Sequence, residues 1–259
     1  MKKNKQSLPL RDKNFLSVIV PAYKQERTIK KDLENIDTTL RIGLGKDYDY
    51  EIICIVDGKL DKTEEEARKV KSSKVKVYSY EKNMGKGFAV RYGMSQAKGD
   101  LISFLDAGRE IGPKGIMMLM AHMDWYKADI IVGSKRHPAS QVKYPFMRHL
   151  ISIGYHFGLW LLFGITVKDT QSGIKIFRRE VVDKILPKLL VKRYAMDIEM
   201  LAVARHFGFS RIYEAPIEIH YKFEDLTHAS TLRSIMQMIW DTLAVYYRLN
   251  ILHYYDKKD

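Results

Sequence analysis

Cysteine is almost absent from this chain of 259 residues, and the single one, Cys54, lies in the apolar run EIICIV. One cysteine forms no disulfide within a chain, and no zinc-ligand spacing accompanies it. The pattern predicts a buried, unreactive Cys54 and a reducing compartment. A small secreted fold held together by disulfides is therefore excluded.

Long apolar runs are also missing. The first apolar stretch, FLSVIV, stops at Pro21, so the basic amino terminus is not followed by a secretory signal. The stretch FGLWLLFGITV, residues 157–167, is shorter than the roughly 18 residues that a spanning helix needs. The sequence therefore predicts no transmembrane helix and a cytoplasmic location.

Acidic residues are in deficit, because 44 Lys and Arg face 31 Asp and Glu, for a formal net charge of +13. Such a surface suits nucleic acid, anionic lipid headgroups or phosphorylated small molecules. The basic residues are spread along the chain, and no helix-turn-helix or zinc-finger spacing is present. We therefore expect no nucleic-acid partner.

What the chain does contain is an alternation of strand and helix patterns. Short apolar, β-branched segments lie at residues 15–23, 50–58, 74–80, 100–108 and 129–137. Helical spacing separates the first four of them, at residues 27–41, 62–72 and 85–98. This order predicts an α/β fold with a mostly parallel sheet flanked by helices, which binds ligands at the carboxyl ends of its strands.

Polar residues stand at or just beyond those predicted strand ends: Tyr23, Asp57, Asn83 and Asp106. Asp57 precedes a glycine, so an ordinary turn is the alternative reading there. The segment NMGKG places Lys86 before a helix, where backbone N–H groups and the ammonium together suit a phosphate. Asp106 offers a hard oxygen ligand for a divalent cation that bridges two phosphates.

These segments carry a family resemblance. VIVPAY, IVDGK, NMGKGFAVRYGMSQAKGDLISFLDAG and DTQSGIKIFRR resemble the family 2 glycosyltransferases with the Rossmann-like GT-A fold. Their order and spacing are most similar to polyprenyl-phosphate sugar transferases of the dolichyl-phosphate mannose and glucose synthase type. The resemblance implies inverting, metal-dependent transfer of a hexose from a UDP- or GDP-linked sugar to a polyprenyl phosphate.

The resemblance also implies a donor site and a metal. The donor nucleotide is expected at Pro21, Ala22, Tyr23, Asp57, Asn83 and Lys86. Asp106 matches the first acid of the D-x-D motif, and Gly108 stands where the second acid is expected. The expected ligands of Mg²⁺ or Mn²⁺ are therefore Asp106 and Glu110.

For the acceptor, the resemblance implies that Ser134, Arg136 and Arg148 grip the lipid phosphate, with solvated surface charge as the alternative. Asp169 and Gln171 are expected to frame the place where acceptor meets sugar. Together with Asp106 and Arg148 they form the expected catalytic set. No single catalytic base is expected, because a polyprenyl phosphate is already ionised.

The carboxyl-terminal residues predict an amphipathic helix. An apolar stripe recurs at helical spacing at Leu232, Ile235, Met236, Ile239, Leu243, Tyr246 and Tyr247. Basic residues border it, namely Arg233, Arg248, Lys257 and Lys258. The pattern favours a helix in the lipid interface, on the cytoplasmic face, although a helix that covers the core shows the same stripe.

The expected domains are a basic tail at 1–14, a GT-A domain at 15–225 and an interfacial helical extension at 226–259. A separate membrane-protein partner stays open. Two other functions also stay open, namely a family 2 transferase that acts on a glycan hydroxyl, and a membrane-associated binding protein on a decayed transferase fold. The second is motivated by Gln25, Val56 and Gly108, which depart from the family pattern.

Overall fold

The computed structural model describes residues 14–108, 111–140, 146–192, 195–218 and 232–257, and within 146–153 and 232–235 it describes the backbone only. Glu110, almost all of the expected tail and the expected boundary at residue 225 lie outside these residues. They stay predictions.

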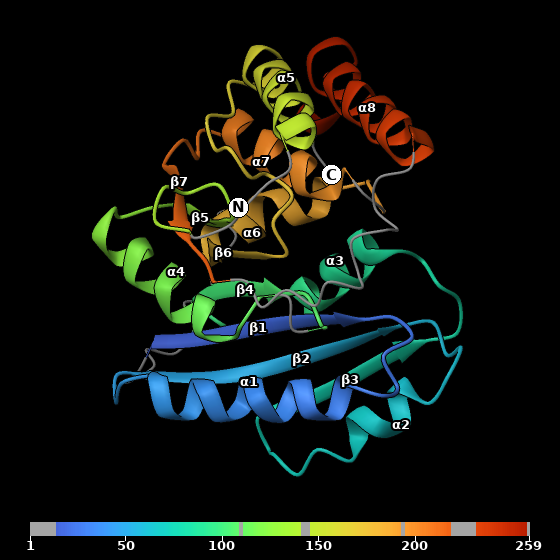
Figure 1. The fold of residues 1–259 in the computed structure, drawn as a ribbon, viewed down its shortest axis with the longest axis vertical. Helices are drawn as coiled ribbons and strands as arrows, with labels where there is room; N and C mark the ends of the chain where they lie inside the picture. Colours follow the sequence, from blue (N-terminus) through green and yellow to red (C-terminus); the bar gives the residue numbers. More distant parts are fainter. Residues whose placement is uncertain (1–13, 109–110, 141–145, 193–194, 219–231, 258–259) are drawn as a thin grey trace, which may run out of the picture.

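A sheet of seven strands forms the centre of the described structure (Figure 1). In spatial order the strands are β3 (Val75–Tyr80), β2 (Tyr48–Asp57), β1 (Asn14–Ala22), β4 (Leu101–Leu105), β6 (Ile174–Arg178), β5 (Ile130–Ser134) and β7 (Ile212–Pro216). β6 runs antiparallel to both neighbours, and all other neighbouring strands are parallel. The predicted mostly parallel α/β sheet is confirmed.

Helices cover both faces of the sheet. One face carries α1 (Ile29–Gly43), α2 (Thr63–Arg68) and α4 (Lys114–Trp125). The other carries α3 (Lys86–Gln96), α6 (Arg179–Ile185), the short 3-10 helix η1 (Leu186–Lys188) and α7 (Met196–His206). Further out on that second face lie α5 (Phe146–Phe163) and α8 (Leu232–Tyr246) (Figure 1). Two short elements follow α8, namely the π turn η3 (Tyr247–Ile251) and the 3-10 turn η4 (Tyr254–Asp256).

Each face of the sheet has its own apolar core. Along β1, Val18 and Val20 enter one core and Ile19 enters the other. A strand buried on both faces must be apolar throughout, which explains the unbroken run in the sequence. Cys54 is fully buried, as predicted, and burial raises the pKa of its thiol to about 12.

The apolar stretch 157–167 is only partly helical. α5 ends at Phe163, so the last four residues of the apolar stretch 157–167 are not helical. Gly164 causes this end, because its φ of +66° lies in the left-handed region that helices do not continue through. Among the described residues, no helix is both long and apolar enough to cross a membrane.

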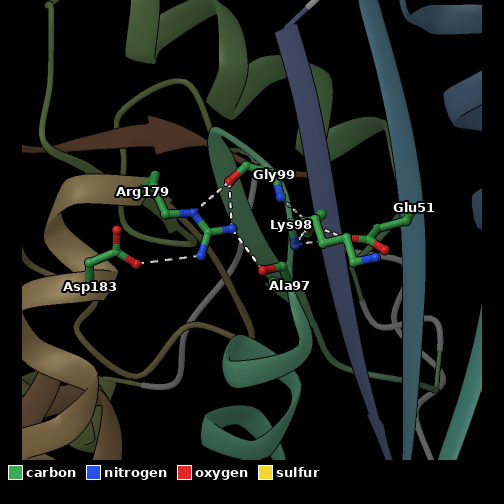
Figure 2. A network of polar contacts seen from close by, with 7 residues as sticks. Glu51, Ala97, Lys98, Gly99, Arg179 and Asp183 are labelled. Carbon is green, nitrogen blue, oxygen red and sulfur yellow. Dashed lines mark hydrogen bonds and ion pairs between the residues drawn. The ribbon is translucent and has the colours of Figure 1, made fainter. Parts of the chain in front are cut away.

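A polar network fixes the turn that leads into β4 (Figure 2). The Arg179 side chain donates to the carbonyl oxygens of Ala97 at 2.9 Å and Gly99 at 2.7 and 2.9 Å. From the other side, the Lys98 N–H donates to Glu51 at 2.8 Å. Burial raises the pKa of Glu51, but hydrogen bonds from Lys76 and Ser17 outweigh this effect and hold the pKa below its ordinary value. The network sets the start of β4, and thereby the position of Asp106 just after its other end.

We expect Arg179→Met to lower the free energy of unfolding by about 2 kcal/mol, since it removes charged hydrogen bonds to backbone carbonyls. Urea unfolding followed by circular dichroism measures this. Arg68→Met is the matched control, because Arg68 forms an exposed pair with Glu64 one helical turn away, and such pairs contribute at most about 0.5 kcal/mol. Equal losses in the two variants would contradict the assignment.

Candidate functional site

The carboxyl ends of β1, β2 and β4 lie next to one another because these strands are parallel neighbours. Tyr23 follows β1, Asp57 closes β2 and Asp106 follows β4. The loop of residues 81–85, which includes Asn83, joins β3 to α3 at the same edge. The topology thus places at one edge the side chains that the strand pattern singled out.

Asp57 anchors the loop before α3. Its Oδ1 accepts the Tyr80 hydroxyl at 2.8 Å and the Met84 N–H at 2.7 Å, and its Oδ2 accepts the Gly85 N–H at 3.0 Å. The carboxylate is nearly buried. Two N–H groups that were expected to face a phosphate are therefore already used, and Asp57 contributes to the site by shaping this loop. Its contact with a nucleotide stays a prediction.

Lys86 and Asp106 form an ion pair at this edge, with 2.7 Å between Nζ and Oδ2. Lys86 is the first residue of α3, and its Nζ also lies 5.6 Å from the centre of the Phe104 ring. The Asp106 N–H donates to the Gly173 carbonyl at 2.9 Å. A Cβ at Gly173 would lie 2.4 Å from Asp106 Oδ2, so only glycine fits against this carboxylate.

Asp106 retains one oxygen for a ligand. Its Oδ1 is buried and has no hydrogen-bond partner among the described residues. Those residues contain no cluster of three or more His, Cys, Asp or Glu side chains that could hold a cation without help. The arrangement fits Mg²⁺ or Mn²⁺ that takes one protein oxygen here and its other ligands from phosphates and water.

Gly108 has a backbone reason to be glycine. Its φ is +114°, a conformation that residues with a side chain rarely adopt. Space is not the constraint, since a Cβ there would meet only Gln25 Nε2, at 3.7 Å. The missing second acid therefore accompanies a turn that disfavours any side chain at this position.

A pocket of about 490 Å³ opens beside the end of β1. Its lining residues are Lys24, Gln25, Glu26, Arg27, Thr28, Leu60 and Asp61. Gln25, which departs from the family pattern, holds this loop, since its N–H donates to Thr63 Oγ1 at 2.7 Å and its Oε1 accepts the Thr28 hydroxyl at 2.7 Å. Tyr23 is exposed and directly precedes the lining residue Lys24 in the sequence. Asn83 is also exposed, in the loop before α3 at the same edge of the sheet. The sequence reading missed Leu60 and Asp61, which follow the Asp-Gly turn.

The expected acceptor residues gather around the end of β5. Ser134 is buried, and its Oγ accepts the Arg136 N–H at 3.1 Å. Arg136 Nη1 donates to the Lys168 carbonyl at 3.2 Å, and Asp169 Oδ2 accepts the Lys135 N–H at 2.9 Å. Burial raises the pKa of Asp169, although Lys135 opposes this.

Two of the expected residues stand apart from this group. Gln171 is exposed, and its amide donates to Met238 Sδ at 2.8 Å, which links the segment after Asp169 to α8. Arg148 lies in the first part of α5, residues 146–153, where only the backbone is described. Its role stays a prediction.

His156 of α5 was not singled out from the sequence. Its Nδ1 is buried and has no hydrogen-bond partner within the described part of the chain. Burial lowers the pKa of His156, the charges of Arg136 and Lys168 lower it further, and Glu214 opposes them. The imidazole is therefore within electrostatic range of Arg136 and Lys168. A lone His in a helix gives no sequence signal for this.

A buried ion pair lies behind the edge. Lys175 of β6 is fully buried, pairs with Asp197 of α7, and donates to the Ser172 carbonyl at 2.9 Å. Burial lowers the pKa of Lys175, whereas Asp197 opposes this. Asp197 lies in the first turn of α7, but its partner is this lysine, and no side-chain cap bond is present there.

Comparisons with known proteins agree with the family resemblance of the sequence. The family model described as Glycosyl transferase family 2 matches residues 17–186. A human dolichyl-phosphate beta-glucosyltransferase is 33% identical over 207 residues, covering 74% of this chain and 63% of its own length. The Dictyostelium discoideum protein of the same name is 29% identical over 249 residues, covering 92% of this chain and 75% of its own length. The chain thus spans less than two thirds of the human relative.

Among solved structures, glucosyl-3-phosphoglycerate synthase from Mycobacterium tuberculosis, in complex with Mn²⁺, UDP-glucose and phosphoglyceric acid, superposes with a TM-score of 0.65 at 18% identity. The match covers 95% of this chain and 81% of the other. At that identity the match shows the fold alone, and it confirms the GT-A arrangement expected from the sequence.

We expect Gly173→Ala to weaken Mn²⁺ binding in the presence of UDP about 10-fold, because the added methyl group displaces the Asp106 carboxylate. Calorimetry measures the affinity. Gly45→Ala is the control, since a Cβ there meets nothing within 4 Å. Unchanged Mn²⁺ affinity in Gly173→Ala would show that the cation does not use Asp106.

Proposed function

This chain belongs to glycosyl transferase family 2, and we propose that it transfers a hexose from a nucleotide-diphosphate sugar to a polyprenyl phosphate. The observation that carries the proposal is the Lys86–Asp106 pair, which sets an ammonium and an unpartnered carboxylate oxygen side by side at the carboxyl edge of the sheet. A sugar diphosphate needs such a combination of charges. The names of the relatives favour glucose as the sugar and a dolichyl-type phosphate as the acceptor.

On the donor side, the residues of this chain bind and orient the diphosphate. Lys86 donates to a phosphate oxygen, and Asp106 Oδ1 would hold Mg²⁺ or Mn²⁺. A bound cation supplies positive charge against the diphosphate as it leaves. Tyr23 and the pocket that includes Lys24 and Asp61 receive the nucleoside. The solved neighbour contains UDP-glucose, which favours UDP as the nucleotide. The transfer assay with UDP- and GDP-sugars decides between the two nucleotides.

On the acceptor side, Arg136, His156 and Arg148 receive the lipid phosphate. Ser134 and Asp169 hold the turn that carries Arg136, through the hydrogen bonds to the N–H groups of Arg136 and Lys135. Gln171 links this region to α8. A phosphate near His156 opposes the positive charges that lower its pKa, so binding favours the imidazolium and adds a donor.

The reaction is an in-line displacement with inversion. An oxygen of the polyprenyl phosphate attacks the anomeric carbon, the bond from that carbon to the diphosphate breaks, and its electron pair leaves with the nucleoside diphosphate. The attacking oxygen carries no proton at neutral pH, so positioning replaces base catalysis. This agrees with the site, where Asp197 is paired with Lys175 and Asp169 accepts a backbone N–H. A glycan hydroxyl would require a free base at this position.

Exposed apolar side chains support a membrane surface as a partner. On α5 they are Phe157, Trp160 and Leu161, and on α8 and the turn after it they are Met236, Ile239, Trp240, Leu243, Tyr247 and Ile251. The stripe predicted for α8 thus faces outward at its described positions, except for Tyr246, which packs against Phe163. Helices with this outward face and a cationic protein surface suit an anionic lipid interface. Arg248 is an exception to the expected basic border, because it turns inward to Glu199.

We expect metal-dependent transfer of radiolabelled sugar from one of a panel of UDP- and GDP-sugars to polyprenyl phosphate. Asp106→Ala should lower the transfer rate roughly 100-fold or more, since it removes charge stabilisation of the leaving diphosphate. Asp183→Ala, at an exposed acid of α6, should match the wild type. Absence of labelled lipid with every donor would contradict the proposal and favour the binding-protein alternative.

We expect Trp240→Asp to weaken binding to vesicles of phosphatidylcholine and phosphatidylglycerol about 10-fold, measured by cosedimentation. Trp125→Asp is a matched control, because Trp125 on α4 is 76% exposed and Trp240 on α8 is 73% exposed, and these two helices lie in different parts of the molecule (Figure 1). Equal weakening in the two variants would mean that general charge, and not the α5–α8 surface, governs binding.

A further inference from the structure

Glu199, in the first turn of α7, joins two separate parts of the chain. Its carboxylate is completely buried. It accepts the N–H groups of Leu190 at 3.0 Å and Val191 at 2.8 Å, and the Tyr255 hydroxyl at 2.7 Å, with Arg248 Nη1 at 3.5 Å. Burial raises the pKa of Glu199, and these donors oppose the rise. A buried carboxylate demands such partners, so the two parts are held to each other through it.

The first of these parts touches the donor site. The Lys192 carbonyl accepts the Gly87 N–H at 2.9 Å. A Cβ at Gly87 would lie 2.7 Å from the Val191 carbonyl oxygen, so the two backbones are in direct contact. This contact fixes the first turn of α3, which begins with Lys86. The segment from Leu190 to Lys192 therefore helps to set where the Lys86 ammonium meets Asp106.

The second part is the carboxyl-terminal stretch, residues 247–256. Arg248 lies in η3 and Tyr255 in η4, both after α8. The same stretch exposes Tyr247, Ile251 and Leu252, which continue the apolar surface of α8. One side of the stretch thus faces Glu199 and the other faces outward.

We infer that Glu199 is a positioning residue for the donor site. It sets Lys86 through the 190–192 segment, and it makes that setting depend on the docking of residues 247–256. The role of Lys86 in holding the donor diphosphate rests on the proposed function, whereas the physical link from Tyr255 to the first turn of α3 does not.

Tyr255→Phe tests the link, with Tyr254→Phe as the matched control. Tyr255→Phe removes one hydrogen bond to Glu199, and the Tyr254 hydroxyl makes no hydrogen bond among the described residues. We expect hydrogen–deuterium exchange at residues 84–92 to become about 10-fold faster in Tyr255→Phe and to stay at the wild-type rate in Tyr254→Phe. Glu199→Gln should change exchange in the same direction.

Steady-state kinetics provide the second readout, with the donor that the wild type uses. We expect Tyr255→Phe to raise KM for the sugar nucleotide about 3- to 10-fold, with kcat and KM for the polyprenyl phosphate within about 2-fold of wild type. A purely structural role of Tyr255 would instead lower the melting temperature and leave both KM values unchanged.

Unchanged exchange at residues 84–92 in Tyr255→Phe, or equal acceleration in both tyrosine variants, overturns the inference. So does a rise in KM for the lipid phosphate alone. Should the wild type transfer no sugar from any donor, the proposed function fails, and the exchange comparison still decides whether the link exists.

Discussion

The Lys86–Asp106 ion pair is the contact on which the candidate donor site depends. It joins the start of α3 to the end of β4, and it leaves the second oxygen of Asp106 without a protein partner among the described residues. Two ammonium groups lie near the Phe104 ring, with Lys86 Nζ at 5.6 Å and Lys175 Nζ at 5.1 Å from the ring centre. Asp197 balances the buried charge of Lys175, so Asp106 is left to balance Lys86. A single carboxylate thus faces both a lysine and the place for a cation.

The antiparallel strand β6 connects this donor half to the acceptor half. It lies between β4 and β5, so its first residues meet the end of β4, with Leu105 opposite Ile174. That register brings the Gly173 carbonyl to the Asp106 N–H, while the segment before it brings Asp169 to the turn after β5. Sugar donor and lipid phosphate are therefore expected on either side of one strand end. The strand order thus brings the segment before β6 into contact with both candidate sites.

The sequence predicted the elements of the first half well because β1, β2 and β4 are buried on both faces and α1 keeps an apolar stripe. Ile29, Leu33, Ile36 and Leu40 of α1 are all buried, as their spacing required. The antiparallel insertion of β6 had no such signal, since an apolar run has the same pattern in either direction. In the sequence Gly108 shows only that the second acid of the D-x-D motif is absent. Its positive φ, which favours glycine, is a property of the folded backbone.

Site residues were harder to predict where a side chain has two uses. Asp57 stands at a strand end, but backbone N–H groups of the next loop occupy its carboxylate. Arg248 borders an apolar stripe in sequence and yet turns to the buried Glu199. His156 and Tyr255 carry no local pattern, because the charges that act on His156 and the carboxylate that binds Tyr255 come from distant segments. Periodicity identifies the face of an element, whereas a polar partner across the fold depends on tertiary packing.

The most direct measurement is the position of Mn²⁺ in crystals grown with UDP-glucose, located by its anomalous scattering. We expect one peak in bonding contact with Asp106 Oδ1 and with the diphosphate, and the Lys86 ammonium turned toward a phosphate oxygen. A cation held away from Asp106, with the Lys86–Asp106 pair intact and the nucleotide elsewhere, would contradict the donor site described here.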